Sequence, residues 1–136
     1  MSVPPVVPAR WLWAARLLRI VDGDTFEADL TRDVDAGFGR RITLSGPQRL
    51  RLNRVDTWPG STPAGRAAAA AVRAEMDAGP FAVETLKPYK YGGSQPAAEY
   101  MAEVTLVDGR NLSDVLLAAG HALPYDGKTA RPTETA

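Results

Sequence analysis

Two short acidic segments hold the side chains best suited to chemistry in this chain. Asp22-Gly23-Asp24 follows one apolar run, and Asp56-Thr57 ends another run that contains Arg51. Carboxylates at two strand ends, with an arginine nearby, suit one hard cation and one phosphate. We therefore expect Asp24 and Asp56 to converge on one site, because two carboxylates held close together repel each other unless a cation joins them.

Simpler interpretations of these residues stay open. Asp22 and Asp24 also fit a purely conformational role, because aspartate is common in tight turns. Arg51 and Asp56 fall on opposite faces of a regular strand, since successive side chains point to opposite sides. A bulge or the turn after Val55 must therefore bring them together, and without it Arg51 is a solvated strand residue.

The composition limits the kind of site that the chain can build. Its 136 residues include no cysteine and a single histidine, His121. Disulfides, thiolate metal sites and zinc sites built from several imidazoles are therefore excluded, and metal chemistry must use oxygen ligands, as with calcium, magnesium or manganese. The formal net charge is zero, which does not favour strong nonspecific binding to DNA.

One segment departs from this neutral balance. No acidic residue occurs between residues 36 and 55, and five arginines fall there: Arg40, Arg41, Arg49, Arg51 and Arg54. This local charge could neutralise nucleic acid phosphates. The alternative is that these arginines cover the wet face of a hairpin.

Turn residues and periodic patterns predict the elements that position these side chains. Residues 1–9 are predicted to be a disordered lead, residues 10–125 one domain, and residues 126–136 a disordered tail. Residues 31–39 are predicted to form a loop, and Ser45-Gly46-Pro47 a turn. We predict helices over 64–78 and 111–119, and strands over 11–21, 24–30, 40–44, 48–55, 81–86 and 99–107.

This order predicts an α+β fold, a β-barrel with helices. The barrel is five-stranded and of the oligonucleotide-binding (OB) type, with one helix after the third strand and one C-terminal helix. Thr62 and Asn111 are predicted to cap the two helices. No signal peptide or membrane-spanning run is seen, so we expect a cytoplasmic protein, of bacterial or bacteriophage origin from its alanine and arginine richness.

The order of these pieces resembles the staphylococcal nuclease (thermonuclease) family over roughly residues 16–125. The matching pieces are V-D-G-D-T at 21–25, R-x-x-x-V-D-T at 51–57, an alanine-rich helix, K-Y-G at 90–92, and a late helix that ends in Ala119-Gly120. The resemblance implies the same small barrel and a metal-dependent nuclease site.

The resemblance also implies a role for each matching residue. Asp24 and Asp56 would supply carboxylate ligands to calcium, and Thr57 its backbone carbonyl. Arg51 would hold the scissile phosphate, because a guanidinium can bind two of its oxygens. The substrate contacts would be Lys90, Tyr91 and Tyr125.

Two departures from the family pattern concern catalysis. The family has a catalytic carboxylate directly after V-D-T-P, where this chain has Pro59 or Gly60. The family's second phosphate-binding arginine follows K-Y-G, where this chain has Gly93. Loss of a general base costs about two to four powers of ten in rate, and loss of an electrostatic donor about two to three more.

We therefore expect a domain that binds a divalent cation, calcium in the simplest case, and nucleic acid phosphates, with weak or altered phosphodiester hydrolysis. The alternative is a noncatalytic module that binds nucleic acid or a protein, including a role in viral assembly or structure. No membrane partner is expected. The choice between DNA and RNA, the oligomeric state and the biological partner stay open.

Overall fold

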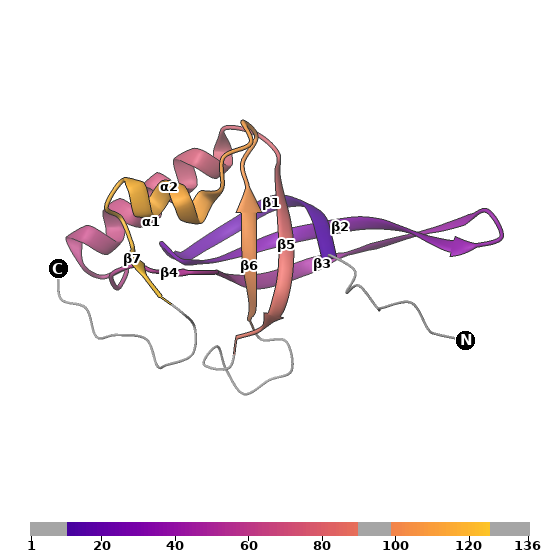
Figure 1. The fold of residues 1–136 in the computed structure, drawn as a ribbon, viewed down its shortest axis with the longest axis horizontal. Helices are drawn as coiled ribbons and strands as arrows, with labels where there is room; N and C mark the ends of the chain where they lie inside the picture. The colour runs from indigo at the N-terminus through magenta and orange to yellow at the C-terminus, as the bar shows by residue number, and fades with distance from the viewer. Residues whose placement is uncertain (1–10, 90–98, 126–136) are drawn as a thin grey trace, which may run out of the picture.

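Strand-forming runs separated by glycine and aspartate turns build a closed β-barrel (Figure 1). The computed structural model describes residues 11–89 and 99–125. The strands around the barrel follow the order β1-β2-β3-β6-β5, in which only β3 and β6 pair in parallel. This confirms the predicted five-stranded barrel. The strand bounds are β1 (Trp11–Asp22), β2 (Thr25–Gly37), β3 (Arg40–Leu52), β5 (Phe81–Pro88) and β6 (Tyr100–Thr105).

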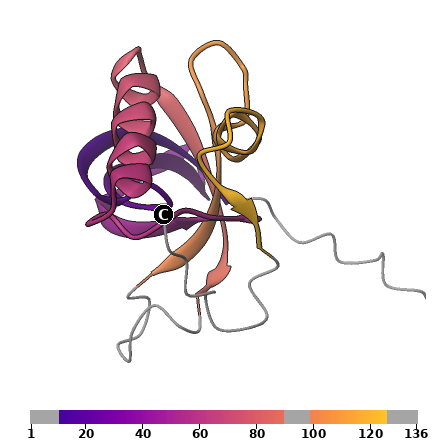
Figure 2. The ribbon, with the colours of Figure 1, turned by 90° about the vertical axis from the view of Figure 1, so that its left-hand side faces the viewer.

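The third barrel strand leads through a short strand, β4 (Val55–Asp56), into the helix α1 (Pro63–Asp77). A second helix, α2 (Leu112–Ala118), precedes β7 (Leu123–Pro124), which pairs with β4. Figures 1 and 2 show both helices at the same end of the barrel. The fold class predicted from the sequence, with one helix after the third barrel strand and one near the C-terminal end, is therefore confirmed.

Both helices begin at the predicted caps. The Thr62 side chain accepts a hydrogen bond from Gly65 N at 3.0 Å, and Pro63 takes the first helical position. The Asn111 side chain accepts one from Asp114 N at 3.1 Å. These side chains satisfy backbone N–H groups that the first helical turn leaves without a partner.

The hairpin of β2 and β3 differs from the prediction. Residues 31–39 are not the predicted loop, and Ser45-Gly46-Pro47 is not the predicted turn. The two strands stay paired out to Gly37 and Arg40, with an irregularity after Asp35, and the chain reverses through Gly37-Phe38-Gly39, where the φ angles are 88°, 55° and 72°. The outer part of this hairpin, residues 31–45, projects from the barrel as an arm (Figure 1).

Cross-strand contacts explain why the arm forms. Val34 lies opposite Ile42, and Thr43 Oγ1 donates to Asp33 Oδ1 at 2.7 Å. Such pairs each contribute roughly 0.2–1 kcal/mol. Gly46 has ordinary strand geometry with no positive φ. The summed pairing therefore outweighs the local turn preference of glycine and proline.

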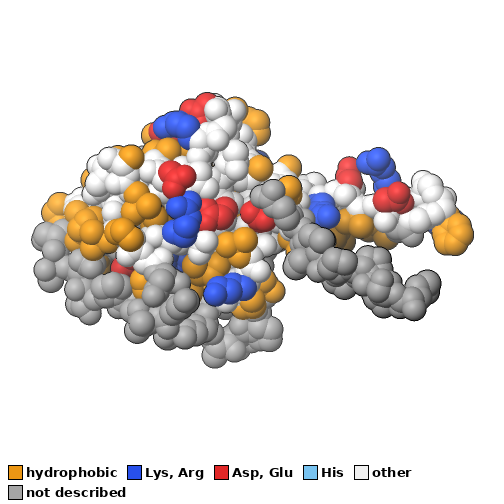
Figure 3. All heavy atoms as spheres, in the orientation of Figure 1, with side chains coloured by type: hydrophobic (Ala, Val, Ile, Leu, Met, Phe, Trp, Pro, Cys, Tyr) orange, Lys and Arg blue, Asp and Glu red, His pale blue; other side chains and the backbone are white. Residues whose placement is uncertain are grey.

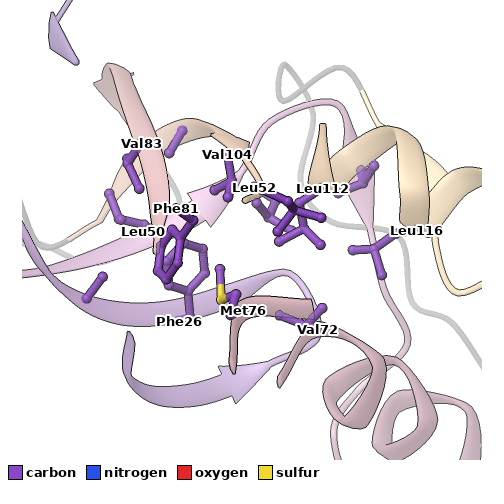
Figure 4. Close-up of a cluster of buried hydrophobic side chains, with 14 of the residues drawn as sticks. Phe26, Leu50, Leu52, Val72, Met76, Phe81, Val83, Val104, Leu112 and Leu116 are labelled. Atoms are coloured by element: carbon purple, nitrogen blue, oxygen red, sulfur yellow. The ribbon is translucent and has the colours of Figure 1, made fainter. Parts of the chain in front are cut away.

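The core fills the barrel and continues under the helices (Figure 4). Phe26 and Phe81 meet edge to face, with ring centroids 6.4 Å apart. Val72 from α1 and Leu116 from α2 cover the end of the barrel. Each such buried side chain stabilises the fold by about 1.5–3 kcal/mol. The further large members of the core include Leu50, Leu52, Met76, Val83, Val104 and Leu112.

Some sequence predictions fall outside the described residues. These are the disordered lead and tail, and the proposed substrate contacts Lys90 and Tyr91. Among residues 11–89 and 99–125, no helix has the length and apolar character needed to cross a membrane.

Candidate phosphate and metal site

Two carboxylates and one arginine meet in the interior of the protein. Asp24 is 0% exposed, and Arg51 and Asp56 are each 1% exposed. The Arg51 guanidinium reaches both acids: its Nη1 lies 3.6 Å from Asp24 Oδ2, and its Nη2 donates to Asp56 Oδ1 at 3.2 Å. One buried cation therefore joins two carboxylates that come from different strand ends.

Asp24 also ties together the chain segments around it. Its Oδ2 accepts a hydrogen bond from Thr57 N at 3.0 Å, and its Oδ1 accepts one from Thr25 Oγ1 at 2.9 Å. Its backbone oxygen accepts one from Leu52 N at 2.8 Å. The first turn of the barrel is thereby held against the end of β3 and the segment that follows β4.

Asp22 has the conformational role that the sequence left open. Its Oδ1 accepts a hydrogen bond from Gly60 N at 3.1 Å, which holds the loop between β4 and α1. Gly23 beside it packs against α1, since an added Cβ would lie 2.8 Å from Ala68 Cβ. The two aspartates of the turn therefore face different partners, and only Asp24 reaches Arg51.

A turn between β3 and β4 brings Arg51 and Asp56 together. It consists of Asn53 and Arg54, and Arg54 has a φ of 72°. This left-handed residue breaks the alternation that would otherwise point Arg51 and Asp56 to opposite faces. The two side chains are therefore reoriented by a turn before Val55, and not by a bulge or by the turn after Val55, the two possibilities that the sequence suggested. Arg51 Nη1 then donates to the carbonyls of Leu52, at 3.2 Å, and Val55, at 2.9 Å.

The Arg54 side chain stabilises this turn from outside. It donates to Glu103 at 3.0 Å and to Asp114 at 2.9 Å. Its hydrogen bonds to Glu103 first, and then to Asp114, raise the pKa of the Arg54 guanidinium above its ordinary value. Burial alone would raise the pKa of Glu103, but hydrogen bonds from Arg54, Asn111 and Asn53 outweigh it and hold that pKa below its ordinary value.

Two tyrosines flank the Arg51 guanidinium. Its Cζ lies 5.0 Å from the ring centroid of Tyr89 and 5.1 Å from that of Tyr125. Both rings are buried and pack with Met101. Cation–π contacts of this kind strengthen when they are removed from water. Tyr125, expected at the substrate, therefore lies beside Arg51, and its role in substrate binding stays a prediction.

The loop after Thr57 offers no general base. It enters α1 through Pro59, whose carbonyl accepts hydrogen bonds from Thr62 N and Thr62 Oγ1. The next acid along the chain, Glu75, is bound by Arg110. Arg110 also pairs with Asp108 at 2.6 Å, so two carboxylates already bind its guanidinium.

The arginines of the acid-free segment do not form one basic surface. Arg49 lies 3.6 Å from Glu27, while Arg51 and Arg54 bind the carboxylates described above. Arg40 and Arg41 are exposed on the arm. Figure 3 shows acidic and basic side chains close to one another on the barrel and along the arm. Carboxylates from elsewhere in the chain thus neutralise most of this local charge.

The donors at Asp24 and Asp56 fit a cation only in part. They are oxygen ligands, as a hard cation prefers. The described residues contain no cluster of three or more histidine, cysteine, aspartate or glutamate side chains able to hold a metal. A cation here would therefore take most of its ligands from water, from the backbone and from a phosphate, as magnesium commonly does.

No family model and no curated protein matches the sequence. The fold supports a coarser statement: it is a five-stranded mixed barrel with two helices, compatible with OB-fold-like families.

Sequence reasoning missed several residues near this site. Tyr89 gave no signal, because its contact with Arg51 depends on how β5 ends. Thr25 resembled an ordinary strand residue, although its hydroxyl binds Asp24. Away from this site, Trp11 and Trp13 could have been recognised as a pair, because residues two apart on a strand share a face. Their rings stack with centroids 5.9 Å apart.

Proposed function

We propose that this protein is a staphylococcal-nuclease-like domain that binds a divalent cation together with a nucleic acid phosphate, and that it hydrolyses phosphodiesters weakly or not at all. The proposal depends on one observation above all: Asp24, Arg51 and Asp56 converge from separate strand ends on one buried point. Fold alone would not support it, because one fold hosts many functions.

The hydrogen bonding of Arg51 supports a phosphate ligand. Its Nε is buried and has no acceptor among the residues that the structure describes. A buried donor without an acceptor costs about 1–3 kcal/mol. A phosphate oxygen would satisfy this donor, and a guanidinium binds phosphate through two parallel hydrogen bonds.

Charge supports a cation that arrives with the phosphate. Asp24 and Asp56 place two carboxylates around the single guanidinium of Arg51. A phosphate that approached Arg51 alone would meet both carboxylates. A divalent cation, when bound, would offset this repulsion and polarise the phosphate. We therefore expect each ligand to strengthen the binding of the other.

The surroundings of the cluster favour binding over rapid turnover. Pro59 and Gly60 supply no base, and Glu75 is bound by Arg110. The cluster is also enclosed by Tyr89 and Tyr125, which are 6% and 8% exposed. Since Arg51 is only 1% exposed, a phosphate must displace part of these surroundings to reach it, so exchange at the site is expected to be slow.

The test measures binding and cleavage separately. Anisotropy of a short fluorescein-labelled DNA strand is followed with calcium, with magnesium and with chelator, in the wild type and in the near-isosteric variants Asp24→Asn and Asp56→Asn. The exposed Asp77→Asn variant is the control. We expect metal-dependent binding that both site variants lose and the control keeps. Equal binding in chelator and in metal would contradict the cation site.

Cleavage is followed as the release of acid-soluble nucleotides from single-stranded DNA, double-stranded DNA and RNA. We expect no release, or slow release that needs metal and the two aspartates. Rapid metal-dependent release that Asp24→Asn abolishes would contradict the inferred catalytic loss. It would mean that another residue replaces the base and the second arginine.

The arm favours a second candidate, a role in protein binding or assembly. Phe38 is fully exposed at its tip, and Ile42, opposite Val34 on the same arm, is 52% exposed. Apolar side chains on a projecting hairpin suit contact with another protein. Sedimentation of the wild type and of Phe38→Ala would test this candidate: a defined oligomer that the variant loses supports it, and a monomer in both contradicts self-assembly.

A further inference from the structure

A groove separate from the ion cluster lies where the arm joins the barrel. Its volume is about 710 Å³, and it is lined by residues of β1, β2, β3, β5 and β6. The two sites meet at neighbouring residues: Pro88 and Tyr100 line the groove, while Tyr89 and Met101 pack beside Arg51. A ligand long enough to pass the ends of β5 and β6 can therefore contact both sites.

Aromatic side chains form one wall of the groove. The rings of Trp11 and Trp13 stack with centroids 5.9 Å apart and an angle of 20° between their planes. Trp13 Nε1 donates to Thr85 Oγ1 at 3.1 Å, which fixes the orientation of that ring. Trp11 is 46% exposed, and Tyr100 also lines the groove. Exposed, oriented rings of this kind offer planar surfaces for stacking.

The charges around the groove select the kind of ligand. Among the described residues that line the groove, Lys87 is the only charged one and none is acidic. The Arg32 guanidinium lies over the Trp11 ring, 4.5 Å from its centroid, so a second cation borders the same wall and a base that stacks on that face must displace it. Gln48 and Ser45 add polar groups. This combination suits a ligand with flat rings and negative charge, and it disfavours a basic peptide.

We propose that this groove binds the unpaired bases of single-stranded nucleic acid, with Trp11 as a stacking surface and Lys87 beside the phosphates. Base stacking on aromatic rings, next to cationic groups, is how proteins hold single strands without reading their sequence. A duplex is excluded, because its bases are already stacked on one another. The inference rests on the proposed function for the class of ligand, but the groove is not lined by Asp24, Arg51 or Asp56.

The experiment follows tryptophan emission during titration with a short thymidine strand in chelator. A Trp58→Phe background removes the third tryptophan, so that the signal comes from Trp11 and Trp13. We expect quenching by the thymidine strand, and much weaker quenching by an abasic strand of equal length or by a duplex. Equal quenching by the abasic strand would overturn the proposal, since phosphate contacts alone would then explain the binding.

Two groove variants and one control complete the test. Anisotropy of the labelled thymidine strand should show affinity lowered about tenfold or more by Trp11→Ala. Lys87→Gln should reduce the slope of log affinity against log salt by about one. Phe38→Ala removes an aromatic ring that is more exposed than Trp11 and lies outside the groove, so it should change neither quantity. Circular dichroism establishes whether each variant is folded. If Trp11→Ala does not fold, Lys87→Gln still tests the groove.

The outcomes separate this inference from the proposed function. If Asp24→Asn abolishes metal-dependent binding but leaves binding in chelator unchanged, the groove acts independently of the ion cluster. Unchanged affinity in both groove variants would overturn the inference and leave the ion cluster unaffected. Quenching by a peptide of residues 1–10, without quenching by the thymidine strand, would also overturn it, because the groove would then bind the protein's own proline-rich segment.

Discussion

Replacing Arg51 with methionine tests whether one cation holds the interior site together. The variant keeps the apolar stem of the side chain but removes the guanidinium. Asp24 and Asp56, which are 0% and 1% exposed, then share the interior without the cation that joins them. Removing one partner of a buried ion pair costs about 3–5 kcal/mol, because the remaining charge is desolvated and uncompensated.

The backbone raises this cost further. The carbonyls of Leu52 and Val55 lose their hydrogen bonds from Arg51 Nη1. Domains have a free energy of unfolding of about 5–15 kcal/mol, so a loss of about 3–5 kcal/mol leaves the variant folded but marginal. In urea, with a slope of about 1–3 kcal/mol per molar, the unfolding midpoint should fall by roughly 2 M.

The assay is urea unfolding followed by circular dichroism, for Arg51→Met and for the triple variant Asp24→Asn, Asp56→Asn, Arg51→Met. The triple variant should recover at least half of the lost free energy, because it carries no unpaired buried charge. Arg41→Met, on the exposed arm, is the control and should change the free energy of unfolding by less than about 0.5 kcal/mol.

Calcium provides a second measurement on the same variant. With Arg51 absent, the two carboxylates lack their joining cation, so calcium should stabilise Arg51→Met more than it stabilises the wild type. A calcium concentration one hundred times the dissociation constant adds about 2.7 kcal/mol. A loss below about 1 kcal/mol in Arg51→Met, or a triple variant as unstable as the single one, would refute the electrostatic account of this site.

Two further substitutions test how the site is positioned. Gly65→Ala should destabilise the protein by roughly 1–3 kcal/mol in urea unfolding, although alanine favours helices, because the added Cβ would lie 1.8 Å from Pro59 O. Gly46→Ala is the control, because an added Cβ there would meet no atom within 4 Å. A Gly65→Ala variant more stable than the wild type would contradict the packing. Glu103→Gln should cost about 1.5–3 kcal/mol at neutral pH. The pKa of Glu103 is lowered in the folded protein. The stability difference between the wild type and Glu103→Gln should therefore reach its maximum above the unfolded pKa of about 4.3 and disappear as the pH falls through the folded pKa. A stability difference that does not change with pH would show that the charge of Glu103 does not matter.

The helices could be predicted from the sequence because their signals are local. Thr62-Pro63 and Asn111 mark two helix starts within a few residues, and both caps form as expected. The arm could not be predicted this way. Its turn is marked by Gly37 and Gly39, but Gly46 and Pro47 give a competing signal that only the pairing of whole strands overrides.

The same distinction applies to the candidate site. Strand-end carboxylates could be recognised from Asp24 and Asp56, because each follows an apolar run. The inward orientation of Arg51 could not, because it depends on a left-handed conformation at Arg54, which arginine rarely adopts. That conformation is stabilised by Glu103 and Asp114, which lie far along the chain and give no local signal.

The parallel pairing of β3 with β6 has a consequence for the order of folding. It joins Leu50 to Tyr100, about fifty residues away in the chain, and β1 reaches β5 over about seventy. Closing such long loops costs more entropy than forming the hairpins of β1, β2 and β3, and it slows folding. Asp24, Arg51 and Asp56 all belong to this early, local part of the chain. The turn at Arg54 that brings Arg51 to Asp56 also needs Glu103 and Asp114. We therefore expect both the charged cluster and the walls of the groove to be completed only when the barrel closes, so that tryptophan emission reports the last step of folding.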